Sequence, residues 1–246
     1  MCNYLGYRLS REYGIWLKNI EKELGLSIAL EVLRSGFTYG DWPVVRRKDD
    51  DIEVVNMHWE FIPWWIKDID GLKAARKQGI PWLNATSEKL LEGKMFRDAA
   101  LKRRCLVLAT HFFEWRHYKP EGAKKDIAYP YCIQLKEKDY FYMAGIWQPW
   151  VDRSTGETMD TFAIVTTKAN PLMEKIHNSK KRMPTILPED LAYEWIFGEL
   201  DETKISEIAS HQIDSEKMEA FSIRKEFKIA EDPLEPYSFE ELPALS

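Results

Sequence analysis

The stretch CLVLATHFFEW, residues 105–115, indicates the fold class of this chain. It is almost wholly apolar and includes β-branched and aromatic residues, which favour a half-buried strand over a helix. Similar short runs recur at 52–59, 131–135, 140–147 and 161–167, and turns rich in Lys, Asp and Gly separate them. We therefore expect an α+β protein with a curved, mostly antiparallel β-sheet or barrel-like core and flanking helices.

Apolar residues at helical spacing predict helices on both sides of this strand-rich region. Residues 10–25 place four apolar side chains at helical spacing behind Ser10, a possible N-cap. Further helical patterns occur at 86–103, 171–177 and 188–198. The 246 residues contain no internal repeat and no Gly/Ser linker, so we expect a single domain over residues 1–246.

Composition excludes several classes of protein. Hydrophobic residues make up 45% of the chain, but no run approaches the roughly 18 uncharged apolar residues of a membrane span, and the first residues do not read as a signal peptide. The cysteines are too few and too scattered for a disulfide framework or a zinc site; they are Cys2, Cys105 and Cys132. We expect a soluble cytoplasmic or nuclear monomer with reduced thiols, no membrane contact, no metal and no other cofactor.

Charge is unevenly distributed along the chain. The formal net charge of −5 argues against a nucleic-acid partner. Residues 186–246, however, hold 16 Asp and Glu against 5 Lys and Arg, so residues 1–185 carry 30 Lys and Arg against 24 Asp and Glu. Either of two basic clusters in that part fits a nucleic-acid surface or an ordinary solvated face. They are Lys102 to Arg104, and Lys168, Lys175, Lys180, Lys181 and Arg182 around His177.

Cys2 is the residue with the most unusual potential chemistry. Removal of Met1 would leave it with a free α-amine, whose pKa is usually about 7.7–8.0, beside a thiol whose pKa is usually about 8.5. Such a 1,2-aminothiol can condense with an aldehyde through an imine, which the sulfur then closes into a five-membered thiazolidine. Cys2 therefore suggests aldehyde capture, although a residue at position two can also be part of an ordinary frayed terminus.

Three further residues carry groups suited to acid–base or hydrogen-bonding chemistry. Asn84 follows the apolar stretch 81–83 and could hold an amine or a carbonyl group, or simply cap a turn. Glu114 lies among aromatic residues, where burial would raise its pKa, unless strand alternation points it at solvent. His177 could exchange protons near neutral pH, although a single His is more often a surface or core residue.

Trp64 and Trp65 are adjacent and follow Pro63 in a predicted loop. Neighbouring side chains on a regular element point in different directions, so the two indoles cannot both face one core. An exposed indole could stack on an unpaired base, which contributes about 1–3 kcal/mol. The alternative is that both rings only pack against the protein.

Together these segments resemble the SRAP family, the abasic-site processing proteins that cross-link themselves to damaged DNA. The family's Cys directly after the initiator Met matches Cys2. Its remaining motifs follow in order: WEFIPWW at 59–65, LNATSE at 83–88, FFEW at 112–115, IVTTKAN at 164–170, then His177 and RMPTIL at 182–187. The resemblance covers most of the chain.

Three departures from the family pattern concern DNA contacts. CNY at 2–4 stands where the family usually reads Cys-Gly-Arg, Thr86 stands in place of an expected Arg, and three extra residues precede Arg182. Thr cannot give a phosphate the contact of an Arg, so we expect nearby lysines to compensate. The DNA-binding residues that the resemblance implies are Trp64, Trp65, Lys94, Thr166, Lys180, Lys181 and Arg182.

The resemblance implies that the protein processes abasic sites in single-stranded DNA through a covalent thiazolidine cross-link at Cys2. Asn84 would position Cys2, Glu114 would carry protons during imine formation, and His177 would assist opening of the sugar ring. Weak lyase activity and a self-processing peptidase step would accompany this chemistry. Two alternatives remain: a cysteine hydrolase or autopeptidase with His177 as base, and a non-catalytic module that binds single strands through its tryptophans.

Overall fold

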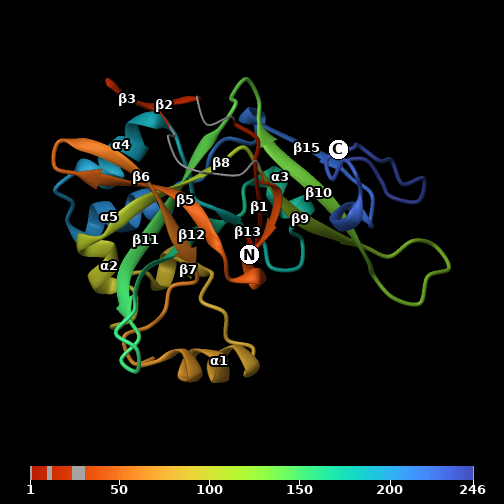
Figure 1. Cartoon of the computed structure of the whole chain (residues 1–246). Helices are drawn as coiled ribbons and strands as arrows, with labels where there is room; N and C mark the ends of the chain where they lie inside the picture. The colour runs from red at the N-terminus through yellow and green to blue at the C-terminus, as the bar shows by residue number, and fades with distance from the viewer. Residues whose placement is uncertain (1, 10–12, 24–30, 246) are drawn as a thin grey trace.

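Five strands close into a barrel (Figure 1). The computed structural model describes residues 2–9, 13–23 and 31–245. Around the barrel the order is β12, β6, β5, β8 and β11, and β11 pairs again with β12. The β12–β6 pair is parallel and the other four pairs are antiparallel. The bounds are β5 (Asp41–Lys48), β6 (Asp51–Trp59), β8 (Arg104–Ala109), β11 (Phe141–Val151) and β12 (Thr158–Lys168).

A second, antiparallel sheet of five strands lies beside the barrel. Its order is β15, β10, β9, β1 and β4. The bounds are β1 (Tyr4–Tyr7), β4 (Glu31–Ser35), β9 (His111–Tyr118), β10 (Ile127–Leu135) and β15 (Met218–Ser222). One continuous hydrophobic core includes buried residues from both the barrel and this sheet.

The stretch 105–115 forms two strands that belong to different sheets. Thr110 separates β8 in the barrel from β9 in the second sheet, and its N–H donates to the carbonyl oxygen of Gly6 in β1. One apolar run therefore holds the two sheets together. The expectation of an α+β protein with a curved, mostly antiparallel, barrel-like core is confirmed.

Shorter elements complete the chain. Three short strands flank the barrel: β7 (Asn84–Thr86), β13 (Arg182–Pro184) and β14 (Ile186–Leu187). The helices are α1 (Ile69–Lys77), α2 (Arg97–Lys102), α3 (Pro171–Ile176), α4 (Glu189–Phe197) and α5 (Glu202–Ala209). The described residues also form four short 3-10 helices: η1 (Gly36–Thr38), η2 (Ser87–Lys89), η3 (Ser215–Lys217) and η4 (Phe227–Ile229). Within the described parts of the chain, no helix is long and apolar enough to cross a membrane.

The prediction of a helix over residues 10–25 is wrong for those residues that the structure describes. Residues 14–17 and 20–23 form the hairpin strands β2 (Gly14–Leu17) and β3 (Ile20–Glu23). Ile15 and Leu17 are buried while Trp16 between them is 45% exposed, which is the alternation of a strand. Lys18 makes the turn with a left-handed φ of 55°. The expected cap, Ser10, lies outside the described residues.

The other expected elements are present, with changes in length. The five predicted apolar runs fall on β6 and on β8 to β12. The helical pattern at 86–103 contains η2 and α2, whereas 171–177 and 188–198 become α3 and α4 almost unchanged. Pro188 is the N-cap of α4, and Glu189 and Asp190 occupy its first turn, where acidic side chains favour the helix N-terminus.

Helix α1, like helix α5, is an element that sequence periodicity does not predict. In Figure 1 it projects from the lower side of the barrel, the loop between β9 and β10 projects to the right, and the start of β1 lies between them. Asp68 caps α1 by accepting a hydrogen bond from the N–H of Gly71 at 2.8 Å. Arg76 near its other end forms a 2.5 Å ion pair with fully buried Glu60. This pair anchors α1 to the segment that directly follows β6.

Candidate active site

The N-terminal strand places Cys2 inside the protein. β1 pairs with β9 through Leu5 opposite Phe112 and Gly6 opposite His111, and the Cys2 side chain is fully buried. A Cβ atom on Gly6 would lie 1.8 Å from Nε2 of His111, so only glycine allows β1 to approach β9 this closely. The strand therefore has a fixed position beside β9.

Glu114 lies on β9 with its side chain turned inward. It is 4% exposed, and burial among apolar groups raises the pKa of its carboxyl to about 7. The pKa of the Cys2 thiol is also raised, first by burial and then by the negative charge of Glu114. The two side chains are therefore close enough to interact electrostatically, and near neutral pH Glu114 can either give or take a proton.

His177 follows the last turn of α3 and faces Glu114. Its Nδ1–H donates to the carbonyl oxygen of Arg182 at 2.7 Å, which leaves the lone pair on Nε2. That Nε2 lies 3.8 Å from Oε2 of Glu114. Burial lowers the pKa of His177 to about 4, so the imidazole is neutral at pH 7. The pair thus combines a neutral base with a carboxyl group that is protonated part of the time.

Asn84 approaches the N-terminal segment from the barrel. It begins β7, which pairs in parallel with β12, and its Nδ2 donates to Oδ1 of Asn3 at 2.9 Å. Asn84 therefore contacts the residue next to Cys2. Sequence analysis missed Asn3, which stands at a position where the family usually has Gly.

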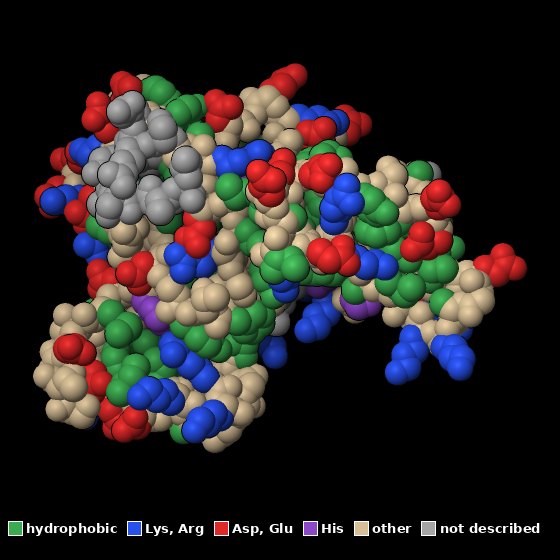
Figure 2. All heavy atoms as spheres, turned by 45° about the vertical axis from the view of Figure 1, so that its right-hand side comes forward, with side chains coloured by type: hydrophobic (Ala, Val, Ile, Leu, Met, Phe, Trp, Pro, Cys, Tyr) green, Lys and Arg blue, Asp and Glu red, His purple; other side chains and the backbone are tan. Residues whose placement is uncertain are grey.

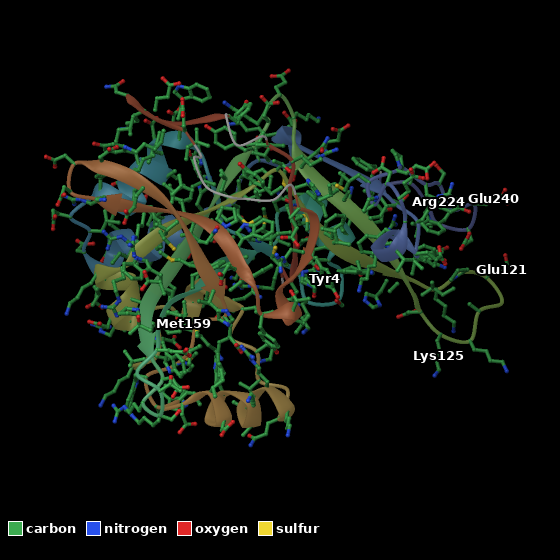
Figure 3. All side chains as sticks on the ribbon, viewed as in Figure 1. Tyr4, Glu121, Lys125, Met159, Arg224 and Glu240 are labelled. Carbon is green, nitrogen blue, oxygen red and sulfur yellow. The ribbon has the colours of Figure 1, made fainter. Side chains whose placement is uncertain are left out.

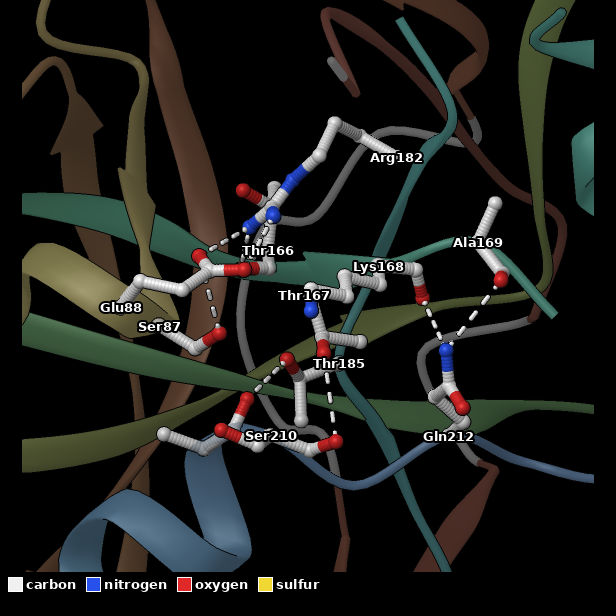
Figure 4. A network of polar contacts seen from close by, with 11 residues as sticks. Ser87, Glu88, Thr166, Thr167, Lys168, Ala169, Arg182, Thr185, Ser210 and Gln212 are labelled. Carbon is white, nitrogen blue, oxygen red and sulfur yellow. Dashed lines mark hydrogen bonds and ion pairs between the residues drawn. The ribbon is translucent and has the colours of Figure 1, made fainter.

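Arg182 is held by an acidic partner that sequence analysis missed (Figure 4). Its Nη1 and Nη2 donate to the two carboxylate oxygens of Glu88 at 2.6 and 2.9 Å, and Nη2 also donates to the carbonyl oxygen of Thr166 at 2.6 Å. Arg182 in turn holds the pKa of Glu88 below its usual range. The charge of Arg182 is therefore largely balanced within the protein.

Three buried polar atoms in this region have no hydrogen-bond partner among the described residues. They are Oδ1 of Asn84, Oγ1 of Thr166 and Nε of Arg182. Thr166 is fully buried and lies opposite Thr86 in the β12–β7 pair. Buried polar groups in proteins are nearly always hydrogen-bonded, so these atoms keep a hydrogen-bonding capacity that the described residues do not use.

The predicted base-stacking residues are exposed. Trp64 and Trp65 are 59% and 42% exposed, and their rings lie edge to face with centroids 5.7 Å apart. Trp65 also packs edge to face on Trp82, so one ring is supported by the protein while the pair stays open to solvent. The loop that holds them lies between β6 and α1.

The predicted lysines are exposed in two places. Lys94 lies in the loop before α2, and Lys180 and Lys181 lie between His177 and β13. Lys181 makes a long 3.9 Å ion pair with Glu174 and has a left-handed φ of 49°. Lys180 lowers the pKa of both His177 and Glu114, although burial has the larger effect on each.

The side chains that commonly bind metals are dispersed. Among the described residues no group of three or more His, Cys, Asp or Glu side chains is arranged to hold a metal ion.

Comparison with known proteins identifies the family. The model of the family described as SOS response associated peptidase (SRAP) matches residues 37–228. The chain belongs to the SRAP family. A relative named abasic site processing protein YoqW, from Bacillus subtilis, is 32% identical over 167 residues, which cover 68% of this chain and 67% of that protein. The abasic site processing protein HMCES of Xenopus tropicalis is 30% identical over 161 residues, covering 58% of this chain and 45% of that protein.

Solved structures show the same fold. A protein from Bacteroides thetaiotaomicron has a TM-score of 0.78 and 33% identity, and the match covers 96% of this chain and 97% of that one. A protein from Bordetella bronchiseptica, with a TM-score of 0.71 and 19% identity, shares the fold. In this chain Cys2, Glu114 and His177 come together from three separate segments of sequence.

Proposed function

We propose that this protein processes abasic sites in single-stranded DNA and forms a covalent thiazolidine link to them through Cys2. The main observation behind the proposal is that Cys2, which could provide a 1,2-aminothiol, lies close to Glu114, whose pKa is about 7. Neutral His177 lies beside Glu114. The names of the relatives, abasic site processing proteins, support the same activity. We also propose that the protein acts as a monomer and as one domain.

The reaction begins with ring opening of the abasic deoxyribose. His177 Nε2 accepts the proton of the C1 hydroxyl while the bond between C1 and the ring oxygen breaks, and protonated Glu114 gives a proton to that oxygen. The products are the C1 aldehyde and the C4 hydroxyl. This step needs the base and the acid near one sugar, and Nε2 and Oε2 lie 3.8 Å apart.

Capture of the aldehyde follows in two steps. The free amine of Cys2 attacks C1, and His177 returns its proton to the aldehyde oxygen. Glu114, now a carboxylate, moves one amine proton to that hydroxyl, which leaves as water, and keeps the second amine proton, which gives the neutral imine. The sulfur of Cys2 then attacks the same carbon, and the thiol proton goes to the imine nitrogen. One aldehyde and one aminothiol thus yield one thiazolidine and one water. Asn84, through Asn3, positions the N-terminal segment for both attacks.

DNA binding would combine stacking with contacts to phosphate. Trp64 and Trp65 offer exposed rings to unpaired bases. Arg182 would bind a phosphate next to the abasic sugar in competition with Glu88, beside Thr166, whose carbonyl oxygen accepts from the same guanidinium. Lys94, Lys180 and Lys181 add positive charge at exposed positions.

Two side reactions belong to the same proposal. An imine that the sulfur does not close can lose the 3′ phosphate by β-elimination, so weak lyase activity is expected. The amine of Cys2 must also be released from its peptide bond to Met1, either by self-processing or by a separate aminopeptidase. A simple thiolate hydrolase is less consistent with the raised pKa of the Cys2 thiol.

Incubation of the Met1-free protein with a single-stranded oligonucleotide that carries one abasic site tests the proposal. We expect an adduct that survives denaturing electrophoresis without borohydride. Absence of such an adduct, with the same protein bound to the oligonucleotide, would reject the cross-linking function and favour a non-catalytic binding module.

A further inference from the structure

The hairpin formed by β9 and β10 extends from the candidate active site to the edge of the molecule. β9 carries Glu114 and continues to Tyr118, which pairs with Ile127 at the start of β10. Four residues of strand span about 13 Å. The loop at 119–126 therefore starts about 13 Å from Glu114 and reaches further out.

This loop has a defined turn. The N–H of Ala123 donates to the carbonyl oxygen of Pro120 at 3.1 Å, and Gly122 has a φ of 77°, which a glycine adopts without strain. The turn gives the side chains that follow it a fixed place at the base of β10. It is not an unstructured linker.

The loop is basic in a protein of net charge −5. Residues 119–126 hold three Lys against two acidic residues. Lys119, Lys124 and Lys125 are exposed, and none of the ion pairs among the described residues involves them. Arg116 is used differently, because its Nη1 donates to the carbonyl oxygen of Pro243.

Lys125 lies on the side of the loop that faces the lower part of the molecule, where α1 projects (Figure 3). Figure 3 shows Lys125 on the lower edge of the loop and Glu121 at its outer end, while Tyr4 marks the start of β1. Figure 2 shows the surface hollowed between the lower lobe and the projecting lobe, with Lys and Arg side chains extending from the latter. Asn178 hydrogen-bonds to His117 of β9, so the segment with Lys180 and Lys181 joins the base of the hairpin.

The two projections offer different chemistry. The loop between β6 and α1 exposes Trp64 and Trp65, whereas the β9–β10 loop carries exposed lysines and no aromatic residue between 119 and 126. Indoles stack on unpaired bases, but lysines without aromatic neighbours contact only the phosphates. The start of β1, which pairs with β9 close to Glu114, lies between the two projections (Figure 1), so a strand with its abasic sugar at Glu114 would meet the two kinds of contact on different flanks of that sugar.

We propose that Lys124 and Lys125 bind backbone phosphates of the DNA strand on the flank of the abasic site opposite to the flank that stacks on Trp64 and Trp65. The inference rests on the proposed function and deepens it. At a rise of about 3.4 Å per nucleotide, 13 Å corresponds to about four nucleotides for a stacked strand. The contact thus lies several nucleotides from the sugar that reacts.

The test measures affinity for two oligonucleotides that contain a tetrahydrofuran abasic analogue. One has eight nucleotides only on the 5′ side of the analogue, and the other has eight only on the 3′ side. The Lys124→Ala/Lys125→Ala variant should bind one of them about 25-fold more weakly at 0.1 M salt, about fivefold for each phosphate that a lysine no longer neutralises. Trp64→Ala should weaken binding of the other.

A matched control is Lys136→Ala/Lys138→Ala, which removes the same charge from exposed lysines at the other end of β10. It should bind both oligonucleotides like the wild type. Equal weakening on both flanks, weakening on the flank that Trp64→Ala affects, or no weakening would overturn the proposal. Failure of the wild type to cross-link a true abasic site would reject the proposed function instead. A loss of affinity on one flank in the Lys124→Ala/Lys125→Ala variant would still show that these lysines bind DNA there.

Discussion

Asn178 binds the backbone of His117 with both atoms of its side-chain amide. Nδ2 donates to the carbonyl oxygen of His117 at 2.7 Å, and Oδ1 accepts from its N–H at 3.0 Å. This double contact ties the residue after His177 to β9, three positions beyond Glu114. The 3.8 Å separation of His177 and Glu114 therefore depends on a residue that touches neither the sugar nor Cys2 in the proposed reaction.

Asn178→Ala should slow cross-linking by about tenfold while leaving DNA affinity unchanged. Its role is to position His177, and a small misplacement of a proton-transfer group lowers the rate more than it lowers binding. Cross-linking should be followed on gels over a pH series, alongside an affinity titration. A changed pH profile supports positioning, whereas an unchanged profile with a lower unfolding temperature would mean that Asn178 only stabilises the fold.

Glu114→Gln should slow cross-linking by about 10²- to 10⁴-fold, because it removes a general acid and base. In the wild type the rate should fall as pH rises through about 7, since the protonated form of Glu114 supplies the proton for ring opening. The variant should have no such limb in its pH–rate profile. Equal rates for the variant and the wild type at pH 6 would contradict the assigned role.

The same residue makes a prediction for stability. The pKa of Glu114 is raised in the folded state, so its favourable contribution is complete below the unfolded pKa of about 4.5 and is lost as pH rises through about 7. His177 has the opposite sign, because its lowered pKa makes the folded state lose stability as pH falls from about 6.5 through about 4. Glu114→Gln should therefore unfold at a higher temperature than the wild type at pH 9, but not at pH 5.

Variants of Cys2 separate the amine from the thiol. Cys2→Ala and Cys2→Ser both keep the α-amine and lose the thiol, so neither should form a stable adduct unless borohydride reduces the imine. Gels with and without borohydride measure both outcomes. An undiminished adduct in Cys2→Ala without reduction would show that another residue is the nucleophile.

Local sequence patterns predict the strands well but not every element. The apolar runs correctly predict strands β6 and β8 to β12. Each run places apolar side chains at alternate or consecutive positions, and burial of those side chains favours a strand. Residues 14–23 match a helical pattern only if Trp16 faces inward, whereas its side chain is 45% exposed. Tertiary contacts decide such a short segment, and here the backbone N–H of Trp16 donates to the hydroxyl of Tyr140 at 2.7 Å.

In the candidate site, too, the sequence alone indicates some of the residues and not others. Cys2, Asn84, Glu114 and His177 could be named from residue chemistry and motif order, and their roles stay predictions. Asn3, Glu88 and Asn178 could not, because each matters only through a partner far away in sequence. Glu88 and Arg182, for example, lie on η2 and β13 and meet only once β7 and β13 both pair with β12.

Glu88→Gln should strengthen DNA binding. In the wild type the two carboxylate oxygens of Glu88 occupy Nη1 and Nη2 of Arg182, so the guanidinium has little charge to offer a phosphate. The amide variant removes one negative charge and leaves a weaker partner, which a phosphate can displace with its charge-assisted hydrogen bonds. Affinity for a single-stranded abasic analogue should rise about fivefold at 0.1 M salt, and the salt slope should steepen by about 0.7.

Glu92→Gln is the matched control for that change. Glu92 is exposed in the loop after η2 and belongs to none of the ion pairs among the described residues, so its loss alters the charge without releasing Arg182. A fluorescence titration across a salt series compares the two variants. If Glu92→Gln strengthened binding as much as Glu88→Gln, the gain would reflect overall charge; if Glu88→Gln bound more weakly than the wild type, Glu88 would be needed to orient Arg182 toward the DNA.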